Sequence, residues 1–190
     1  MQGFLRQACL LGLLVSSLSG QELTPKFEFE APVIRESVFK EGLGLLDRER
    51  EEYASAMATF ATNHVSRKKG DKASLDFAKK ALALALHLSS RNKRATVTKF
   101  QLSKGILPKQ VDPEYSPKAL AALFVTRAEI LFEQKGEKNL LLARALIELA
   151  VTIDPHNEDA IYAYEVQKID YGEFKWDPFT KSAKAKAVNP

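Results

Sequence analysis

Residues 70–95 read GDKASLDFAKKALALALHLSSRNKRA, and residues 136–160 read GEKNLLLARALIELAVTIDPHNEDA; the two stretches are versions of one segment. They align at an offset of 65 positions, which places Asn92 opposite Asn157. In both copies apolar residues recur at spacings of three and four, the pattern of an amphipathic helix. An internal helical repeat predicts stacked helices that together form an extended binding surface.

Helical periodicity continues through most of the remaining chain and predicts an all-α fold of antiparallel helical hairpins stacked in a short array. The first helical pattern begins at Glu36 and closes at residues 67–70. Gly42 and Gly44 inside it indicate a break or kink, because glycine destabilises a helix interior. Prolines and glycines separate the later segments. The further predicted helices cover residues 72–88, 93–104, 117–135, 139–153 and 160–170.

The N-terminus has the pattern of a secretory signal peptide over residues 1–19. Arg6 precedes an uncharged apolar stretch, and the small residues that end at Ser19 match the cleavage rule, so we expect a cut near Ser19. The stretch is too short to span about 30 Å of hydrocarbon. We therefore expect an exported protein, periplasmic or extracellular, with no transmembrane span.

Two regions without helical periodicity border the helical repeat domain, which we place at residues 36–172. Residues 20–35 contain Pro25 and Pro32 and predict an extended N-terminal arm that lies along a groove of the helical body. Residues 173–190 begin with closely spaced aromatic residues, which we interpret as a strap packed on the last helix. They end in a polar tail that we expect to be disordered.

The second copy of the repeated segment resembles a tetratricopeptide repeat. Ala143, Ala150 and Pro155 stand at spacings of seven and five, as do the two packing alanines and the helix-ending proline of that family. Phe132 and Gly136 occupy its aromatic and turn-glycine positions. The resemblance implies closely packed helix pairs and a protein-interaction scaffold.

The match to the family is closer over residues 117–170 than over residues 50–105. The second copy lacks the tryptophan and glycine that the family has early in the first helix of a unit, and in the first copy Ser90 stands where the family has proline. The offset of 65 is close to two periods of about 34 residues, so residues 93–104 are interpreted as the remainder of an intervening unit. The family's peptide-binding residues have no matching positions in this chain, and we assign none.

Residue types that carry catalysis are sparse in this chain. Cys9, the only cysteine, lies inside the signal peptide, so the mature chain is expected to contain no thiol. His64, His87 and His156 lack a second ligand at metal-binding spacing and are interpreted as solvated or capping residues. No phosphate-binding glycine loop, nucleophile elbow or His-Glu-x-x-His pattern occurs. Three carboxylates that could converge in space are interpreted as surface residues: Glu129, Glu133 and Glu148. We expect no catalytic residue, cofactor or metal, and therefore no enzyme.

The basic residues are concentrated in residues 67–109, which hold twelve Lys and Arg against two Asp, between acidic flanks. One group precedes a predicted helix and another follows it, roughly 25 Å away for a helix of about 17 residues, with Lys72, Lys79 and Lys80 between them. The positive electrostatic field of these basic residues would attract an anionic partner. The candidate partner-binding residues are Arg67, Lys68, Lys69, Arg91, Lys93 and Arg94.

These observations favour a non-catalytic, exported interaction scaffold that offers a groove or a basic helical face to another protein of the cell envelope. The alternative is a surface module that uses the basic block to bind an anion: a glycan, a lipid head group or an acidic protein. A small helical enzyme is a remote third hypothesis. Nucleic acid is disfavoured, because no aromatic residues interleave the block for base stacking. The sequence leaves open whether the block binds a ligand or balances the acidic flanks within the fold or a homo-oligomer.

Overall fold

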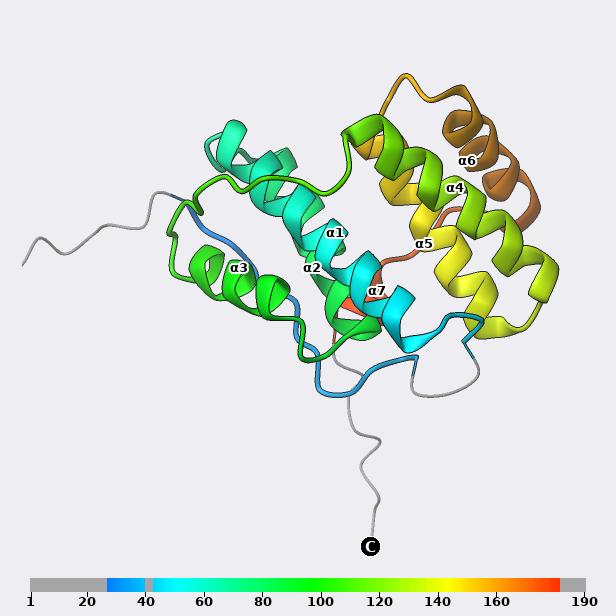
Figure 1. Cartoon of the computed structure of the whole chain (residues 1–190), viewed down its shortest axis with the longest axis horizontal. Helices are drawn as coiled ribbons and strands as arrows, with labels where there is room; N and C mark the ends of the chain where they lie inside the picture. Colours follow the sequence, from blue (N-terminus) through cyan, green and yellow to red (C-terminus); the bar gives the residue numbers. More distant parts are fainter. Residues whose placement is uncertain (1–26, 40–42, 182–190) are drawn as a thin grey trace, which may run out of the picture.

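The computed structural model describes residues 27–39 and 43–181 of the 190-residue chain. Within these ranges it contains helices and no strands, which confirms the predicted all-α fold class (Figure 1). The helices are α1 Asp47–Arg67, α2 Lys72–Leu88, α3 Lys93–Ser103, α4 Pro117–Gln134, α5 Glu137–Ile153, α6 Glu158–Tyr171 and α7 Asp177–Thr180. None of the helices in the described ranges has the length and apolar character needed to cross a membrane. The predicted signal peptide, the first part of the arm and most of the polar tail lie outside the described residues.

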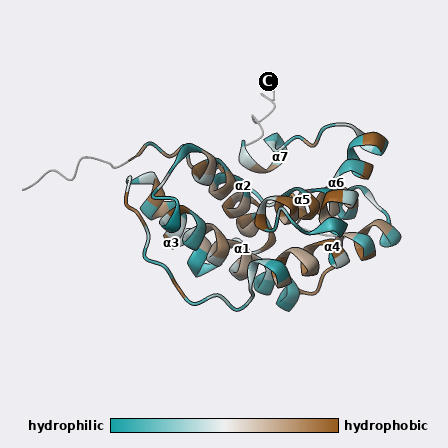
Figure 2. Ribbon diagram, turned by 90° about the horizontal axis from the view of Figure 1, so that it is seen from above, coloured by the Kyte–Doolittle hydropathy of each residue, from teal (hydrophilic) through white to brown (hydrophobic). Residues whose placement is uncertain are grey.

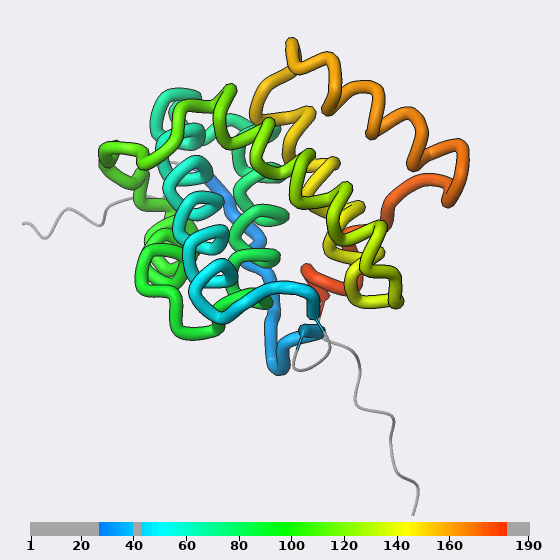
Figure 3. The backbone as a smooth tube through the Cα atoms, turned by 45° about the vertical axis from the view of Figure 1, so that its right-hand side comes forward, coloured from blue at the N-terminus to red at the C-terminus, as the bar shows by residue number. Residues whose placement is uncertain are grey.

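Two antiparallel hairpins, α1 with α2 and α4 with α5, form the centre of the molecule (Figure 1). α3 packs on α1 and α2, and α6 packs on α5 and α4, so the chain forms two three-helix units. We call them the N unit (α1, α2 and α3) and the C unit (α4, α5 and α6). Figures 1 and 3 show α3 and α6 on opposite outer sides of the molecule, with the hairpins between them.

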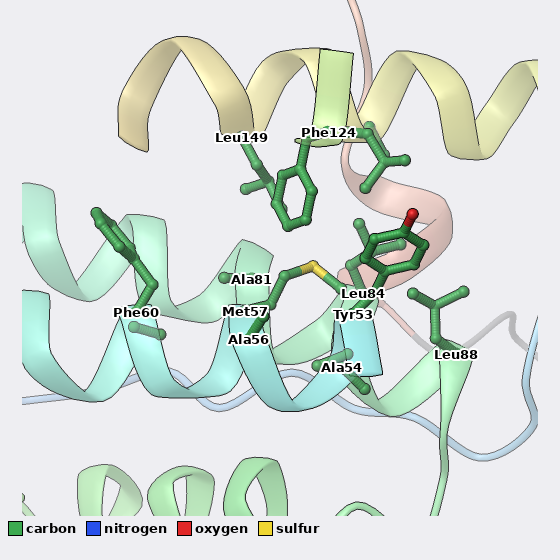
Figure 4. Close-up of a cluster of buried hydrophobic side chains, with 14 of the residues drawn as sticks. Tyr53, Ala54, Ala56, Met57, Phe60, Ala81, Leu84, Leu88, Phe124 and Leu149 are labelled. Carbon is green, nitrogen blue, oxygen red and sulfur yellow. The ribbon is translucent and has the colours of Figure 1, made fainter. Parts of the chain in front are cut away.

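The two units share one hydrophobic core, which forms where the hairpins face each other (Figure 4). Tyr53 of α1 meets Phe124 of α4 edge to face, with 6.0 Å between the ring centroids. Met57 of α1, Leu84 of α2 and Leu149 of α5 lie around these rings, and all three are buried. Because each such side chain contributes about 1.5–3 kcal/mol on burial, this contact holds the units together.

α2 is the central helix of the fold, since it packs against α1, α3, α5 and α7. Every residue from Ala81 to Leu88 is buried. Ala78 and Ala85 are also without exposed surface, and their small side chains let neighbouring helices approach closely. The second half of α2 is therefore buried on all sides, as in a core helix, while Lys72, Asp76, Lys79 and Lys80 keep part of its first half at the surface.

The two copies of the repeated segment end in the same turn. After α2 the Asn92 side chain accepts a hydrogen bond from the Ala95 N–H, and after α5 the Asn157 side chain accepts one from the Ala160 N–H, both at 2.9 Å. The backbone N–H of each asparagine donates to the carbonyl oxygen three residues earlier, at 3.1 Å in both turns. Asparagine is a favoured N-cap residue, so these contacts give a physical reason for its presence at both aligned positions.

The first helix starts later than the sequence predicts: α1 begins at Asp47, not at Glu36. Arg50 of α1 donates to the carbonyl oxygen of Phe39, at 2.9 Å, and to that of Leu88, at 3.0 Å. These hydrogen bonds hold the segment before α1 against the end of α2. Helical periodicity alone is misleading here, because the backbone of this segment binds to distant residues rather than to its own next turn.

The described part of the N-terminal arm, residues 27–34, forms no helix and lies beside α2. Phe27 packs over Gly70, where the backbone has a φ of 73° and an added Cβ would lie 2.5 Å from the phenyl ring. Glu30 forms an ion pair with Lys79 at 2.7 Å. Glycine at position 70 therefore serves both the turn before α2 and the close approach of the arm.

The aromatic strap, which the sequence predicts on the last helix, packs instead on α2 through the short helix α7. Phe179 of α7 is fully buried, and its ring centroid lies 5.7 Å from that of Phe39 and 5.5 Å from that of His87. The Val33 N–H donates to the carbonyl oxygen of Thr180 at 3.2 Å. The arm and the strap thus bind to each other as well as to α2, an arrangement that depends on contacts between residues far apart in the sequence.

Candidate functional site

All six candidate basic residues are exposed, and they lie in two clusters at opposite ends of α2. The 67–69 cluster, between α1 and α2, consists of Arg67, Lys68 and Lys69. The 91–94 cluster consists of Arg91, in the turn after α2, and of Lys93 and Arg94, the first two residues of α3. Lys69 has a φ of 54°, so the first cluster lies where the chain reverses direction.

Two of the three lysines of α2 between the clusters, Lys79 and Lys80, form ion pairs with nearby carboxylates. Lys79 pairs with Glu30 at 2.7 Å, and Lys80 pairs with Asp76 at 2.6 Å. The hydrogen bond from Lys79 and its positive charge lower the pKa of the Glu30 carboxyl. Since these carboxylates offset the charge along the helix, the two clusters are separate basic sites rather than the ends of one continuous stripe.

The 91–94 cluster borders a groove of about 680 Å³ between α1, α3 and residues 105–111. We call this groove the N groove. Lys93 and Arg94 line it together with Lys109, while Glu51 contributes one carboxylate. The 67–69 cluster does not share this site, because its Arg67 lines a separate cavity of about 30 Å³. The structure therefore brings together two of the six candidate residues and adds Lys109 as a third basic residue.

Apolar side chains accompany the basic residues of the N groove. Val97 of α3 and Ile106 beyond it both line the groove, and each is 47% exposed. Deeper in the groove Thr62 and Thr98 are buried and joined by a hydrogen bond of 2.8 Å. Half-exposed aliphatic groups beside lysine and arginine suit an amphipathic ligand. Its apolar side can cover the aliphatic groups, and its acidic groups can form ion pairs with the basic ones.

The segment after α3 is held beside α1 by two side chains of that helix. Asn63 donates from Nδ2 to the carbonyl oxygen of Val111 and accepts the Val111 N–H at Oδ1, with both distances at 2.8 Å. Further along the loop, the Tyr115 hydroxyl donates to the Glu52 carboxylate, and this hydrogen bond raises the pKa of Tyr115 to about 12. One wall of the N groove is therefore an extended segment anchored to α1 at two points.

A second groove, of about 320 Å³, lies between α4 and α6 in the C unit. We call it the C groove. Glu129, Asp159 and Asp170 line it, and its described lining contains no lysine or arginine. Tyr162 also lines it and is 73% exposed. The C groove is thus an acidic and aromatic counterpart of the basic and aliphatic N groove.

The two grooves occupy equivalent positions in the two units. Four of the five residues of α3 that line the N groove have counterparts 65 positions later that line the C groove, and 65 is the offset that relates the repeated segments. The pairs are Arg94 and Asp159, Val97 and Tyr162, Thr98 and Ala163, and Gln101 and Val166. The replacement of Arg94 by Asp159 reverses the charge at one equivalent position.

Gln167 brings an unpaired acceptor to the wall of the C groove. The residue is 2% exposed and donates from Nε2 to Glu148 at 3.1 Å, but its Oε1 has no hydrogen-bond partner in the described part of the chain. Burial raises the pKa of the Glu148 carboxyl. A buried acceptor without a partner costs about 1–3 kcal/mol, so a donor supplied by a bound partner would be stabilised here.

One of the three histidines differs from its sequence interpretation. His87 is neither solvated nor a cap: it is 3% exposed, accepts the Val38 N–H at Nδ1 and donates from Nε2 to the Phe179 carbonyl oxygen at 3.0 Å. Burial lowers its pKa. His64 is half-buried and His156 is exposed. In the described ranges no group of three or more His, Cys, Asp or Glu could hold a metal ion.

Sequence reasoning identifies Lys93 and Arg94 but not the other residues of the N groove. Lys109, Val97 and Ile106 join them only because the chain after α3 turns back along α1. No family model matches this chain, and comparisons with curated proteins and with solved structures return no match. The resemblance to tetratricopeptide repeats therefore stays a prediction from the sequence.

Proposed function

We propose that this chain is a non-catalytic protein-interaction scaffold that binds an acidic, apolar surface of another protein in the N groove. The observation that supports this most strongly is the lining of that groove, where Lys93, Arg94 and Lys109 surround the half-exposed Val97 and Ile106. Removing apolar surface from water supplies affinity, at about 25 cal/mol per Å². Charges at the rim supply orientation and a faster association rate.

The signal-like N-terminus supports an envelope location for both the scaffold and its partner. Helical repeat folds bind through extended surfaces between stacked units, and the N groove lies between two helices of the N unit. The tetratricopeptide-like spacing of the second copy agrees with the same role. An exported scaffold that joins envelope proteins is therefore the function we assign.

A second candidate is a general anion-binding surface that engages a glycan or a lipid head group. The 67–69 cluster favours it, because three exposed basic residues follow one another there without an ion pair in the described part of the chain. Such binding needs charge but no apolar groove, and it weakens steeply with added salt. The two candidates therefore differ in which basic cluster they require.

Fluorescence anisotropy with a labelled peptide of alternating glutamate and leucine, and in parallel with a heparin oligosaccharide, distinguishes the two candidates. The groove variant carries Lys93→Ala, Arg94→Ala and Lys109→Ala, and the matched control carries Arg67→Ala, Lys68→Ala and Lys69→Ala. Both lose the same formal charge. We expect the groove variant to bind the peptide about tenfold more weakly, equivalent to about 1.4 kcal/mol, and the control to change far less.

Equal losses of peptide affinity in both variants would favour the anion-binding surface, because net charge rather than the groove would then decide binding. Failure of the unaltered chain to bind the peptide at low salt would contradict the leading proposal. Binding of heparin that depends mainly on the 67–69 cluster would support the second candidate. Circular dichroism of each variant checks that helix content is retained.

A further inference from the structure

Six of the ten large apolar side chains that are exposed in the described part of the chain lie on its two outer helices. In the N unit Val97 and Phe100 of α3 are 47% and 59% exposed. In the C unit Ile161, Tyr162 and Ile169 of α6 are 40%, 73% and 82% exposed. Figure 2 shows apolar residues alternating with polar ones along α6 at the edge of the molecule. Apolar groups concentrated in this way mark interaction surfaces more often than scattered ones do.

The charges on these two helices are opposite in sign. The basic residues of α3 are Lys93, Arg94 and Lys99, and its sequence contains no acidic residue. The acidic residues of α6 are Glu158, Asp159, Glu165 and Asp170. The one basic residue of α6, Lys168, pairs with Glu173 at 3.2 Å. Equivalent helices of the two units thus present apolar surfaces with complementary charge.

Geometry prevents the two surfaces from meeting within one molecule. α3 and α6 lie on opposite outer sides, and both hairpins stand between them (Figures 1 and 3). Complementary surfaces at opposite ends of one chain can pair only between separate molecules. Pairing of α3 with α3, or of α6 with α6, would place like charges together and is disfavoured.

We propose that a second copy of this chain is the partner, and that α3 and the N groove of one copy dock on α6 and the C groove of the next. The proposal rests on the proposed function of the N groove as a site for an acidic, apolar surface, and it identifies that surface as α6 and the C groove of another copy. Tyr162 and Ile169 cover Val97 and Phe100 in this contact. Donors from the basic helix also become available to the C groove, whose wall contains the unpaired Gln167 oxygen.

Charge reversal on each helix tests the proposal. The basic-face variant carries Lys93→Glu and Arg94→Glu, and the acidic-face variant carries Glu165→Lys and Asp170→Lys. All four residues are exposed. The reversals at the N-terminus of α3, and Asp170→Lys in the last turn of α6, also suit the helix dipole, which favours acidic residues near the start of a helix and basic residues near its end.

Sedimentation equilibrium of the unaltered chain over about 1–200 µM measures the association. We expect the weight-average mass to rise above the monomer value with concentration in low salt and to fall back towards it in about 0.5 M salt. Each variant alone should remain monomeric. An equimolar mixture of the two should associate again, because the reversed faces complement each other.

A control variant, Lys68→Glu with Lys69→Glu, makes the same change of charge at a turn outside both faces. It should associate as the unaltered chain does, and a monomeric control would overturn the proposal in favour of a net-charge effect. The proposal also fails if the unaltered chain is monomeric throughout, if either face variant still associates, or if the mixture does not. Thermal unfolding shows whether each variant is folded, and the mixture keeps the test decisive even if single variants lose some stability.

These results separate the present proposal from the proposed function. A monomeric chain that binds the glutamate–leucine peptide through Lys93, Arg94 and Lys109 keeps the scaffold function and excludes the second copy as partner. A chain that associates in the mixing experiment but ignores the peptide supports the second copy while contradicting peptide binding in the N groove.

Discussion

Asn92 and Asn157 occupy aligned positions in the repeat, but the structure gives them different numbers of contacts. Both cap the following helix. Asn92 is 2% exposed and also donates from Nδ2 to Glu51 and to Ser55, at 2.8 Å each. One asparagine therefore starts a helix, and the other starts a helix and ties it to α1 as well.

Alanine substitution should separate these two roles. Asn157→Ala should lower the free energy of unfolding by about 1 kcal/mol, the usual cost of a lost N-cap. Asn92→Ala should lower it by about 2–3 kcal/mol, because hydrogen bonds to α1 are lost in addition. Urea unfolding of the two variants measures the difference. Equal losses would show that the contacts to α1 contribute little.

The imidazole of His87 gives the fold a pH dependence. Burial lowers its pKa in the folded state. As the pH falls through the ordinary histidine range, His87 therefore binds a proton in the unfolded chain but stays neutral in the folded one. Stability from this residue is therefore full above the unfolded pKa of about 6.5 and is lost as pH falls below it. Burial also lowers the pKa of His64, which acts in the same direction.

We expect the melting temperature to fall between about pH 7.5 and pH 5. His87→Gln replaces the imidazole by an amide that does not titrate but can still donate and accept hydrogen bonds, and it should reduce this fall while lowering stability at neutral pH. The double variant with His64→Gln should reduce the fall further. A pH profile that His87→Gln leaves unchanged would mean that the protonation of this residue does not matter to folding.

At the scale of helices, the packing alanines test the hairpin arrangement. Ala85 of α2 and Ala150 of α5 are both fully buried and stand at aligned positions. Ala85→Leu and Ala150→Leu should each destabilise the fold by about 1–3 kcal/mol through overpacking. Ala122→Leu on the exposed side of α4 is the control and should change stability by no more than about 0.5 kcal/mol. Neutral results at both buried positions would contradict close helix pairing.

The predicted helices agree best with the structure where a local signal marks their ends. α2 spans Lys72–Leu88 as predicted, because Asp71 caps its start through Ser74 and the turn at Asn92 follows its end. Prediction is wrong at the start of α1, since Arg50 draws the preceding backbone into tertiary hydrogen bonds. A helix end is predicted correctly where the contact that sets it joins residues close in the sequence, and wrongly where that contact joins residues far apart in the sequence.

The same rule applies to the candidate site. Lys93 and Arg94 are predictable because charge and helix ends are local properties of the sequence. Lys109 and Ile106 join them only because Asn63 holds the backbone of Val111 beside α1, a contact between residues 48 positions apart. The strap is placed by an even longer contact, from His87 to Phe179, which are 92 positions apart. Helical periodicity in the sequence carries no information about either of these two long-range contacts.

At the scale of the molecule, the repeated segments differ in charge more than in packing. Their packing alanines are buried in both copies, and both asparagines cap the following helix, while the charged residues of α3 and α6 are mostly of opposite sign. Net charge and composition conceal this difference, because the basic and acidic surfaces nearly cancel to give +4. The arrangement of units converts a charge asymmetry along the sequence into an asymmetry in space.

The position of α3 and α6 on opposite sides has a consequence for any assembly built through them. A contact between unlike surfaces leaves one of each unoccupied at the two ends, so the assembly has polarity and does not close unless the rotation between copies completes a ring. Growth at one end would then be stopped by a protein that offers only an acidic helix, and at the other by one that offers only a basic groove. Length would be regulated separately at each end.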